Sequence, residues 1–131
     1  MTALRLQAED LTRIRFGFSP LAELVTGLRL ALSDAPHPLH KPWLRSTHEA
    51  LAGFDLETWR TLLPSRGYLP DFLTPPPVDG VPSFAAELHR LAATPPERVR
   101  GDMPSLRIVA VNPSATTFDL FEHHPREALD R

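Results

Sequence analysis

Three histidines form the polar cluster in this sequence that could do chemistry. His37 and His40 lie three residues apart, and His48 follows after the start of the next predicted helix. Neutral imidazoles bind Zn²⁺, but a structural zinc needs four protein ligands and a catalytic zinc needs three. Asp34 and Glu49 would have to move toward the histidines to complete such a set. Because prolines flank His37 and His40, we interpret them as loop and cap residues and expect neither a metal nor a cofactor.

A serine, a histidine and an aspartate nearby indicate a second kind of chemistry. Ser46, His48 and Asp55 could be arranged on paper as a nucleophile, a base and an orienting group. Ser46, however, lies within a predicted helix, and no nucleophile-elbow motif surrounds it. The glycines are scattered, so the sequence also lacks a phosphate-binding loop. We therefore expect a protein that is not an enzyme.

The proline-rich segment 67–77, called the clamp below, is expected to hold the helices together and to close any pocket that the domain has. Pro70 and the run 75–77 prevent a regular helix, because proline fixes φ and lacks an N–H. The apolar side chains of the clamp should therefore lie extended on a helical core, and a sensed ligand would occupy an apolar cavity beneath them. The candidate pocket residues are Trp43, Trp59, Tyr68, Phe72, Leu73 and Phe84. A purely structural clamp, with both tryptophans in the core, is the alternative.

Helices are predicted on both sides of the clamp, and the clearest spans 20–32. Ser19 is a good N-cap, and Pro20 occupies the first helical position, where its missing N–H costs nothing. Apolar residues then recur at helical spacing, which predicts one core-facing stripe. The stripe consists of Leu21, Leu24, Val25, Leu28 and Leu32, with Leu24 and Leu28 expected in the core.

Similar signals predict further short helices at 8–14, at 42–52, after Asp55 and after Ser83. Thr94 and Glu97 enclose two prolines in the pattern of a capping box, which predicts another short helix that ends near Gly101. The residues expected to face inward are Trp43, Leu44, Thr47 and Leu51 in the helix at 42–52, Leu56, Trp59 and Leu63 in the helix after Asp55, and Phe84, Leu88 and Leu91 in the helix after Ser83.

The end of the sequence is less regular. Residues 106–111 include β-branched side chains and could pair as a strand with 4–6. Ser114 to Phe121 is expected to form a helical turn, and Pro125 is expected to begin a helix within which the sequence ends at Arg131. We predict a single domain over 1–131 with a mainly α fold. It is a compact bundle of short helices with an extended clamp and at most a small two-stranded β element.

Composition limits the classes of function. The chain has 131 residues, 42% of them hydrophobic, and a net charge of −2, which gives no basic footprint for nucleic acid. The absence of cysteine removes disulfides and thiolate chemistry. No apolar run approaches the roughly 18 residues that span a bilayer, and charged residues interrupt the N-terminus. We expect a cytoplasmic protein that does not enter a membrane.

Five stretches of the sequence carry a family resemblance. They are 15–21 (RFGFSPL), 39–43 (LHKPW), 52–56 (AGFDL), 67–76 (GYLPDFLTPP) and 93–100 (ATPPERVR). In this order they resemble the N-terminal region of long bacterial ArsR-type winged-helix transcriptional regulators. The likeness spans roughly residues 4 to 101, and residues 68–76 are its most specific part.

The resemblance implies the non-DNA-binding regulatory half of a transcriptional regulator, which positions a DNA-reading head or senses a ligand. In that group a winged helix-turn-helix follows further along a much longer chain. DNA contact is therefore expected only through a domain that this sequence lacks, and the sequence resembles a truncated fragment. The implied partners are that domain or another copy of the chain, with a small-molecule effector. A free-standing small-molecule-binding protein or small enzyme on the same scaffold is the alternative.

Overall fold

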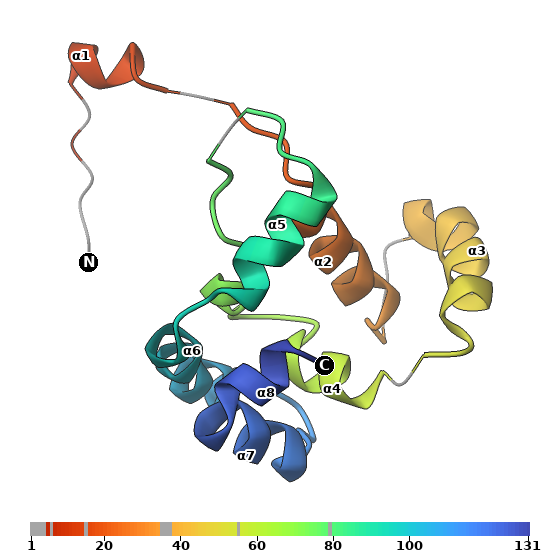
Figure 1. Ribbon diagram of the computed structural model, residues 1–131. Helices are drawn as coiled ribbons and strands as arrows, with labels where there is room; N and C mark the ends of the chain where they lie inside the picture. The colour runs from red at the N-terminus through yellow and green to blue at the C-terminus, as the bar shows by residue number, and fades with distance from the viewer. Residues whose placement is uncertain (1–4, 6, 15, 35–37, 55, 79) are drawn as a thin grey trace.

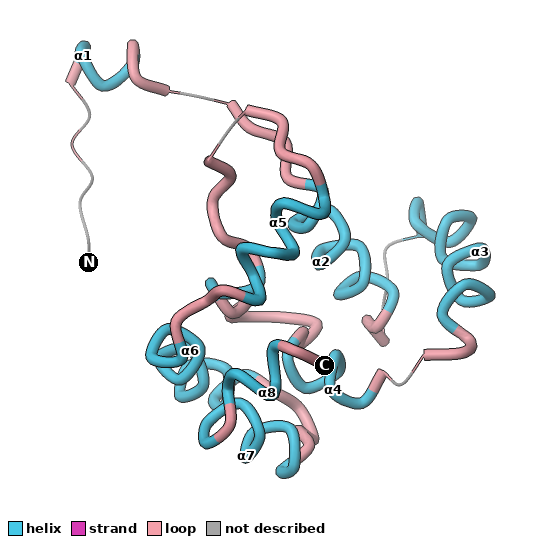
Figure 2. Tube along the Cα trace, in the orientation of Figure 1, coloured by secondary structure: helices cyan, strands magenta, loops and turns pink. Residues whose placement is uncertain are grey.

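The computed structural model describes residues 5, 7–14, 16–34, 38–54, 56–78 and 80–131. Over these residues the fold is mainly α, as predicted, and Figure 2 shows helices joined by loops. Residues 4 and 6 of the predicted strand and the predicted cap Asp55 lie outside the described residues. The helices of the described part are α1 (Ala8–Leu11), α2 (Pro20–Ala31), α3 (Lys41–Leu51), α4 (Glu57–Leu62), α5 (Phe84–Ala92), α6 (Pro96–Val109), α7 (Ala115–His123) and α8 (Pro125–Leu129), with 3-10 turns η1 (Pro38–His40) and η2 (Asp71–Leu73).

Three serine caps begin helices where the sequence predicts them. The side-chain oxygens of Ser19, Ser83 and Ser114 accept hydrogen bonds from the backbone N–H three residues further on, at 3.0–3.2 Å. Each bond satisfies one of the N–H groups that a helix start leaves without a partner. Pro20 and Pro125 occupy the first positions of α2 and α8, as expected.

The core lies where the C-terminal helices meet α2, α4 and the clamp. Figure 1 shows α6, α7 and α8 gathered beside α4, while α2 and α5 lie together and α3 is set apart on the other side of α2. The buried core residues are Leu21, Val25, Leu62, Leu63, Phe72, Leu73, Val99, Met103, Leu106, Phe118, Phe121 and Ala128. The clamp therefore contributes directly to the core.

Helix α6 is longer than the sequence predicts. It continues through Gly101 and Pro104 to Val109, so the predicted end near Gly101 and the predicted strand at 106–111 are both wrong. Val99, Met103 and Leu106 are fully buried at spacings of four and three residues, which is the periodicity of a helix. Burial of this stripe outweighs the local cost of a glycine and a proline within the helix.

The predicted capping box at the start of α6 is also wrong. The N-cap is Pro95, and no side chain caps the helix there. The Thr94 hydroxyl donates instead to the carbonyl oxygen of Arg90, at 3.5 Å. Thr94 therefore belongs to the end of α5, and the two prolines turn the chain into α6.

The apolar stripe of α2 is narrower than predicted. Leu21 and Val25 are buried and Leu28 packs partly against the core, but Leu24 is 53% exposed. At 100° per residue, Leu24 lies at the edge of the arc that the other stripe residues share. The expectation that Leu24 is a core residue is therefore wrong.

Helix α3 contacts the outer side of α2. Leu44 is buried, but Trp43 is 44% exposed, so it does not face inward as the sequence predicts. The Trp43 ring lies over Gly27, where an added Cβ would be 3.5 Å from the ring. Because α2 already presents its other face to the core, α3 is placed at the periphery of the fold.

Helix α5 turns a carboxylate inward where the sequence predicts Phe84 and Leu88. These two side chains are 39% and 40% exposed, whereas Glu87 is buried. The Oε2 atom of Glu87 accepts a hydrogen bond from the backbone N–H of Leu21, at 2.8 Å, in the first turn of α2. This position at a helix N-terminus favours a carboxylate and offsets part of the cost of its burial, although Oε1 of Glu87 is buried without a hydrogen-bond partner among the described residues. The prediction is wrong for Phe84 and Leu88, while Leu91 packs against the core as expected.

Candidate ligand-binding groove

A carboxylate on α6 holds the clamp in place. The Tyr68 hydroxyl donates to Oδ1 of Asp102 at 2.7 Å, and the Phe72 backbone N–H donates to Oδ2 at 3.0 Å. The clamp enters this arrangement at Gly67, whose φ of +81° favours glycine. A Cβ at this position would lie only 2.9 Å from Cγ1 of Val109, so glycine also permits the close approach to α6.

The clamp packs onto other helices than the sequence predicts. Phe72 and Leu73 are buried, and the rings of Phe72 and Phe121 lie 5.9 Å apart at an interplanar angle of 35°. The turn η2 within the clamp contacts α6 and α2. Trp43 and Phe84, which were expected beneath the clamp, are each more than one third exposed. The aromatic contact therefore comes from α7, although Trp59 does pack against the same core.

The environment of Tyr68 stabilises its neutral phenol. Burial, the hydrogen bond to Asp102 and the negative charges of Asp102 and Asp71 raise the pKa of Tyr68 to about 12, with burial as the largest cause. The phenol is therefore a hydrogen-bond donor throughout the physiological range. It is suited to holding the clamp rather than to transferring a proton.

A groove of about 590 Å³ runs beside the clamp and is open to solvent. One wall is the clamp itself, with Asp71, Phe72, Thr74, Pro75 and Pro76. The other wall is the junction of α5 and α6, with Arg90, Ala93, Thr94, Pro95, Arg98 and Asp102. Its volume is within the range of small-molecule sites. Four charged side chains line it, however, so it is not the apolar cavity that the sequence predicts.

The charged residues of the groove differ in how far they are already bonded. One Arg90 nitrogen donates to the carbonyl oxygen of Pro76 at 2.9 Å, which ties α5 to the clamp. Both Asp102 oxygens accept hydrogen bonds from the clamp. The side chains of Arg98 and Asp71, in contrast, make no hydrogen bond or ion pair with the described part of the chain. Arg98 and Asp71 are therefore the charged groups of the groove that remain available to a ligand.

The structure separates the six predicted pocket residues. Phe72 lines the groove, and Tyr68 and Leu73 fix the clamp that forms its wall. Trp43 lines a shallow hollow between α2 and α3, together with His40. Trp59 is partly buried and packs against the core, and Phe84 is partly exposed on α5.

The groove residues Arg90, Arg98 and Asp102 were missed from sequence. The single local signal is the spacing of four residues between Arg98 and Asp102, which is typical of an ion pair on a helix surface. That pattern points to solvent and gives no sign that Asp102 turns toward the clamp.

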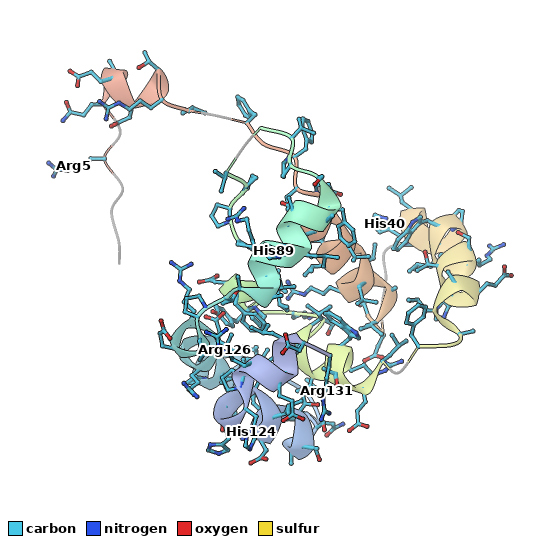
Figure 3. All side chains as sticks on the ribbon, in the orientation of Figure 1. Arg5, His40, His89, His124, Arg126 and Arg131 are labelled. Atoms are coloured by element: carbon cyan, nitrogen blue, oxygen red, sulfur yellow. The ribbon has the colours of Figure 1, made fainter. Side chains whose placement is uncertain are left out.

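The histidines do not assemble a metal site in the part of the chain that the structure describes. His37 lies outside it, and no group of three His, Asp or Glu residues within it could hold an ion. Figure 3 shows His40, His89 and His124 on separate elements, at η1, on α5 and between α7 and α8. His40 and His48 are both exposed near and on α3.

Comparison with protein-family models, with curated proteins and with solved structures gives no match for the chain. Among the described residues, no helix has both the length and the apolar character needed to cross a membrane. Inference about function therefore proceeds from the groove and from the resemblance in the sequence.

Proposed function

We propose that the chain is the non-DNA-binding N-terminal regulatory domain of a cytoplasmic transcriptional regulator of ArsR type, and that it acts by binding a small effector. The observation that carries the proposal is the position of the clamp. Residues 68–76, the most specific part of the sequence resemblance, provide one wall of the groove. The same segment reaches into the core through Phe72 and Leu73. A bound effector would therefore contact a segment that is packed into the core of the domain.

Regulation by this route requires that the effector alters how the domain meets its partner. Arg90 joins α5 to Pro76 and Asp102 joins α6 to Tyr68, so hydrogen bonds connect the two walls of the groove. A ligand that binds one arrangement of these walls better than another shifts their equilibrium by the difference in its affinities. The partner would be the DNA-reading winged-helix domain or a second copy of the chain.

A free-standing small-molecule-binding protein is the second candidate, because the groove does not depend on a further domain. Catalysis is less well supported. Both Asp102 oxygens accept hydrogen bonds from the clamp, and the Thr94 hydroxyl donates to a backbone carbonyl. These interactions do not arrange the two groups as a base and a nucleophile.

Transcript profiling separates the two candidates. The gene is deleted from its host and then restored as wild type, as Arg98→Ala or as Arg45→Ala. A regulator predicts that deletion changes a small set of transcripts, that Arg98→Ala alters the same set, and that Arg45→Ala on α3 restores the wild-type profile. An unchanged transcript profile on deletion would contradict the regulator and favour the free-standing binding protein.

A further inference from the structure

The Arg98 guanidinium makes no bond to the described residues, although an acidic residue lies one helical turn away on α6. Arg98 and Asp102 are four residues apart on α6, a spacing at which opposite charges commonly pair. No ion pair within 4 Å joins them, and the two Asp102 oxygens accept hydrogen bonds from Tyr68 and Phe72 instead. The groove therefore contains an arginine whose guanidinium is available to a ligand.

Arg90 and the prolines complete the recognition surface. The hydrogen bond to Pro76 fixes the Arg90 side chain and leaves its other N–H groups without a bond to the described residues. A guanidinium presents its donors in a planar fork that matches the two oxygens of a carboxylate. Pro75, Pro76 and Pro95 add rigid apolar surface beside these donors, which suits a ligand with an apolar body.

The charge balance of the groove disfavours a ligand that carries several negative charges. Its charged residues are Arg90, Arg98, Asp71 and Asp102, so their formal charges cancel. A single carboxylate can bind Arg98, but further negative charges would meet Asp71 and Asp102. A phosphate monoester, with nearly two charges at neutral pH, fits less well than a carboxylate.

We propose that the groove binds a small monoanionic carboxylate with an apolar body, its oxygens on Arg98 and Arg90 and its apolar part on the prolines. If the chain is a regulatory domain, as proposed above, this carboxylate is its effector. Arg98 supplies the main recognition, because it is the groove arginine whose guanidinium makes no bond to the described residues, whereas Arg90 is bonded to Pro76.

Amide chemical-shift mapping on the chain of 131 residues tests this assignment. The probes are 3-phenylpropionate, 3-phenylpropylamine as a cation of similar shape, and phenyl phosphate as a more highly charged anion. We expect 3-phenylpropionate to shift the amide signals of Phe72, Thr94 and Arg98, with a Kd of about 1 mM for so small a probe. The amine should give no saturable shift there, and phenyl phosphate should bind several-fold more weakly.

Variants assign the binding to Arg98. Arg98→Ala should weaken 3-phenylpropionate at least about tenfold, and Arg98→Lys should weaken it less, since lysine keeps the charge but loses the fork. Arg45→Ala removes an equivalent exposed arginine from α3 and should leave the Kd unchanged. Because Arg98 is exposed and bonds to no described side chain, both Arg98 variants should retain the helical circular dichroism spectrum of the wild type.

Three results would overturn the proposal. They are equal or tighter binding of the amine or of phenyl phosphate, binding that survives Arg98→Ala, and the absence of shifts at the groove with 3-phenylpropionate. If the groove fails this test, the transcript experiment still decides whether the chain has a regulatory role. Binding without any transcript change would instead retain the carboxylate site and reject the regulatory role.

Discussion

The carboxylate of Asp102 holds the clamp against α6. Its two oxygens accept hydrogen bonds from the Tyr68 hydroxyl and from the Phe72 N–H, which lie 34 and 30 positions before Asp102 in the chain. Hydrogen bonds to a charged acceptor contribute more than neutral ones, about 1.5–3 kcal/mol each in favourable settings. At the scale of single residues, this carboxylate is the group that couples the groove to the fold.

Tyr68 reports on this connection because it is the single tyrosine of the chain. Its phenol should titrate with a pKa of about 12, followed by the ultraviolet absorbance of tyrosinate. Asp102→Asn should lower that pKa, because it removes a negative charge and weakens the hydrogen bond. The pKa should stay above the usual value of 10, since burial is the largest cause of the shift.

The same titration sets the sign of a stability change at alkaline pH. The folded pKa is raised, so the contribution of the neutral phenol is fully present below pH 10 and is lost as the pH rises toward about 12. Asp130→Asn, on an exposed carboxylate after α8, is the control and should leave the pKa of Tyr68 unchanged. A pKa near 10 in the wild type would contradict the bonded geometry.

At the scale of elements, the predicted apolar stripe of α2 contains both buried and exposed leucines. Leu21→Ala should lower the free energy of unfolding by about 2–5 kcal/mol, because it removes buried side-chain volume and leaves a cavity. Leu24→Ala, in the same helix, should change it by no more than about 0.5 kcal/mol, because that side chain is mostly exposed. Urea unfolding measures both, and equal losses would mean that the stripe is buried as the sequence predicts.

Two glycines give opposite expectations for the same substitution. Gly101→Ala should stabilise the fold by about 0.5–1 kcal/mol, because Gly101 lies within α6 and an added Cβ meets nothing within 4 Å. Gly67→Ala should destabilise it by at least about 1–2 kcal/mol, the cost of a left-handed residue, with the contact to Val109 added. Thermal unfolding of the pair checks both signs, and a destabilised Gly101→Ala would show that α6 is interrupted there.

The elements could be predicted from sequence where local signals and burial agree. Ser19, Ser83 and Ser114 mark helix starts because a cap acts over three residues. The end of α6 could not be placed, because Gly101 and Pro104 locally favour a stop while burial of Met103 and its neighbours favours continuation. Burial of such residues is a property of the whole fold and outweighs propensity.

At the scale of the molecule, the groove joins segments that local sequence patterns cannot bring together. Its walls come from residues 71–76 and 90–102, and the clamp was recognised as a structural unit from its prolines. Which helices the clamp meets depends on tertiary packing, and α7 rather than α3 or α5 supplies its aromatic neighbour. The mainly α class could be predicted because it is a sum over many helices, whereas the site depends on one arrangement of them.

The charge of the whole chain leads to a final prediction about nucleic acid. The chain carries 14 basic and 16 acidic side chains, so approach to a polyanion is unfavourable on balance. A protein that neutralises several phosphates loses affinity steeply as salt rises, because counterions are released on binding. Residues 1–131 should therefore show no salt-dependent binding to duplex DNA in fluorescence anisotropy, at concentrations where a winged-helix control protein binds. Micromolar binding that weakens steeply between low and physiological salt would place a DNA-reading surface on this chain and refute the assignment of DNA contact to a separate domain.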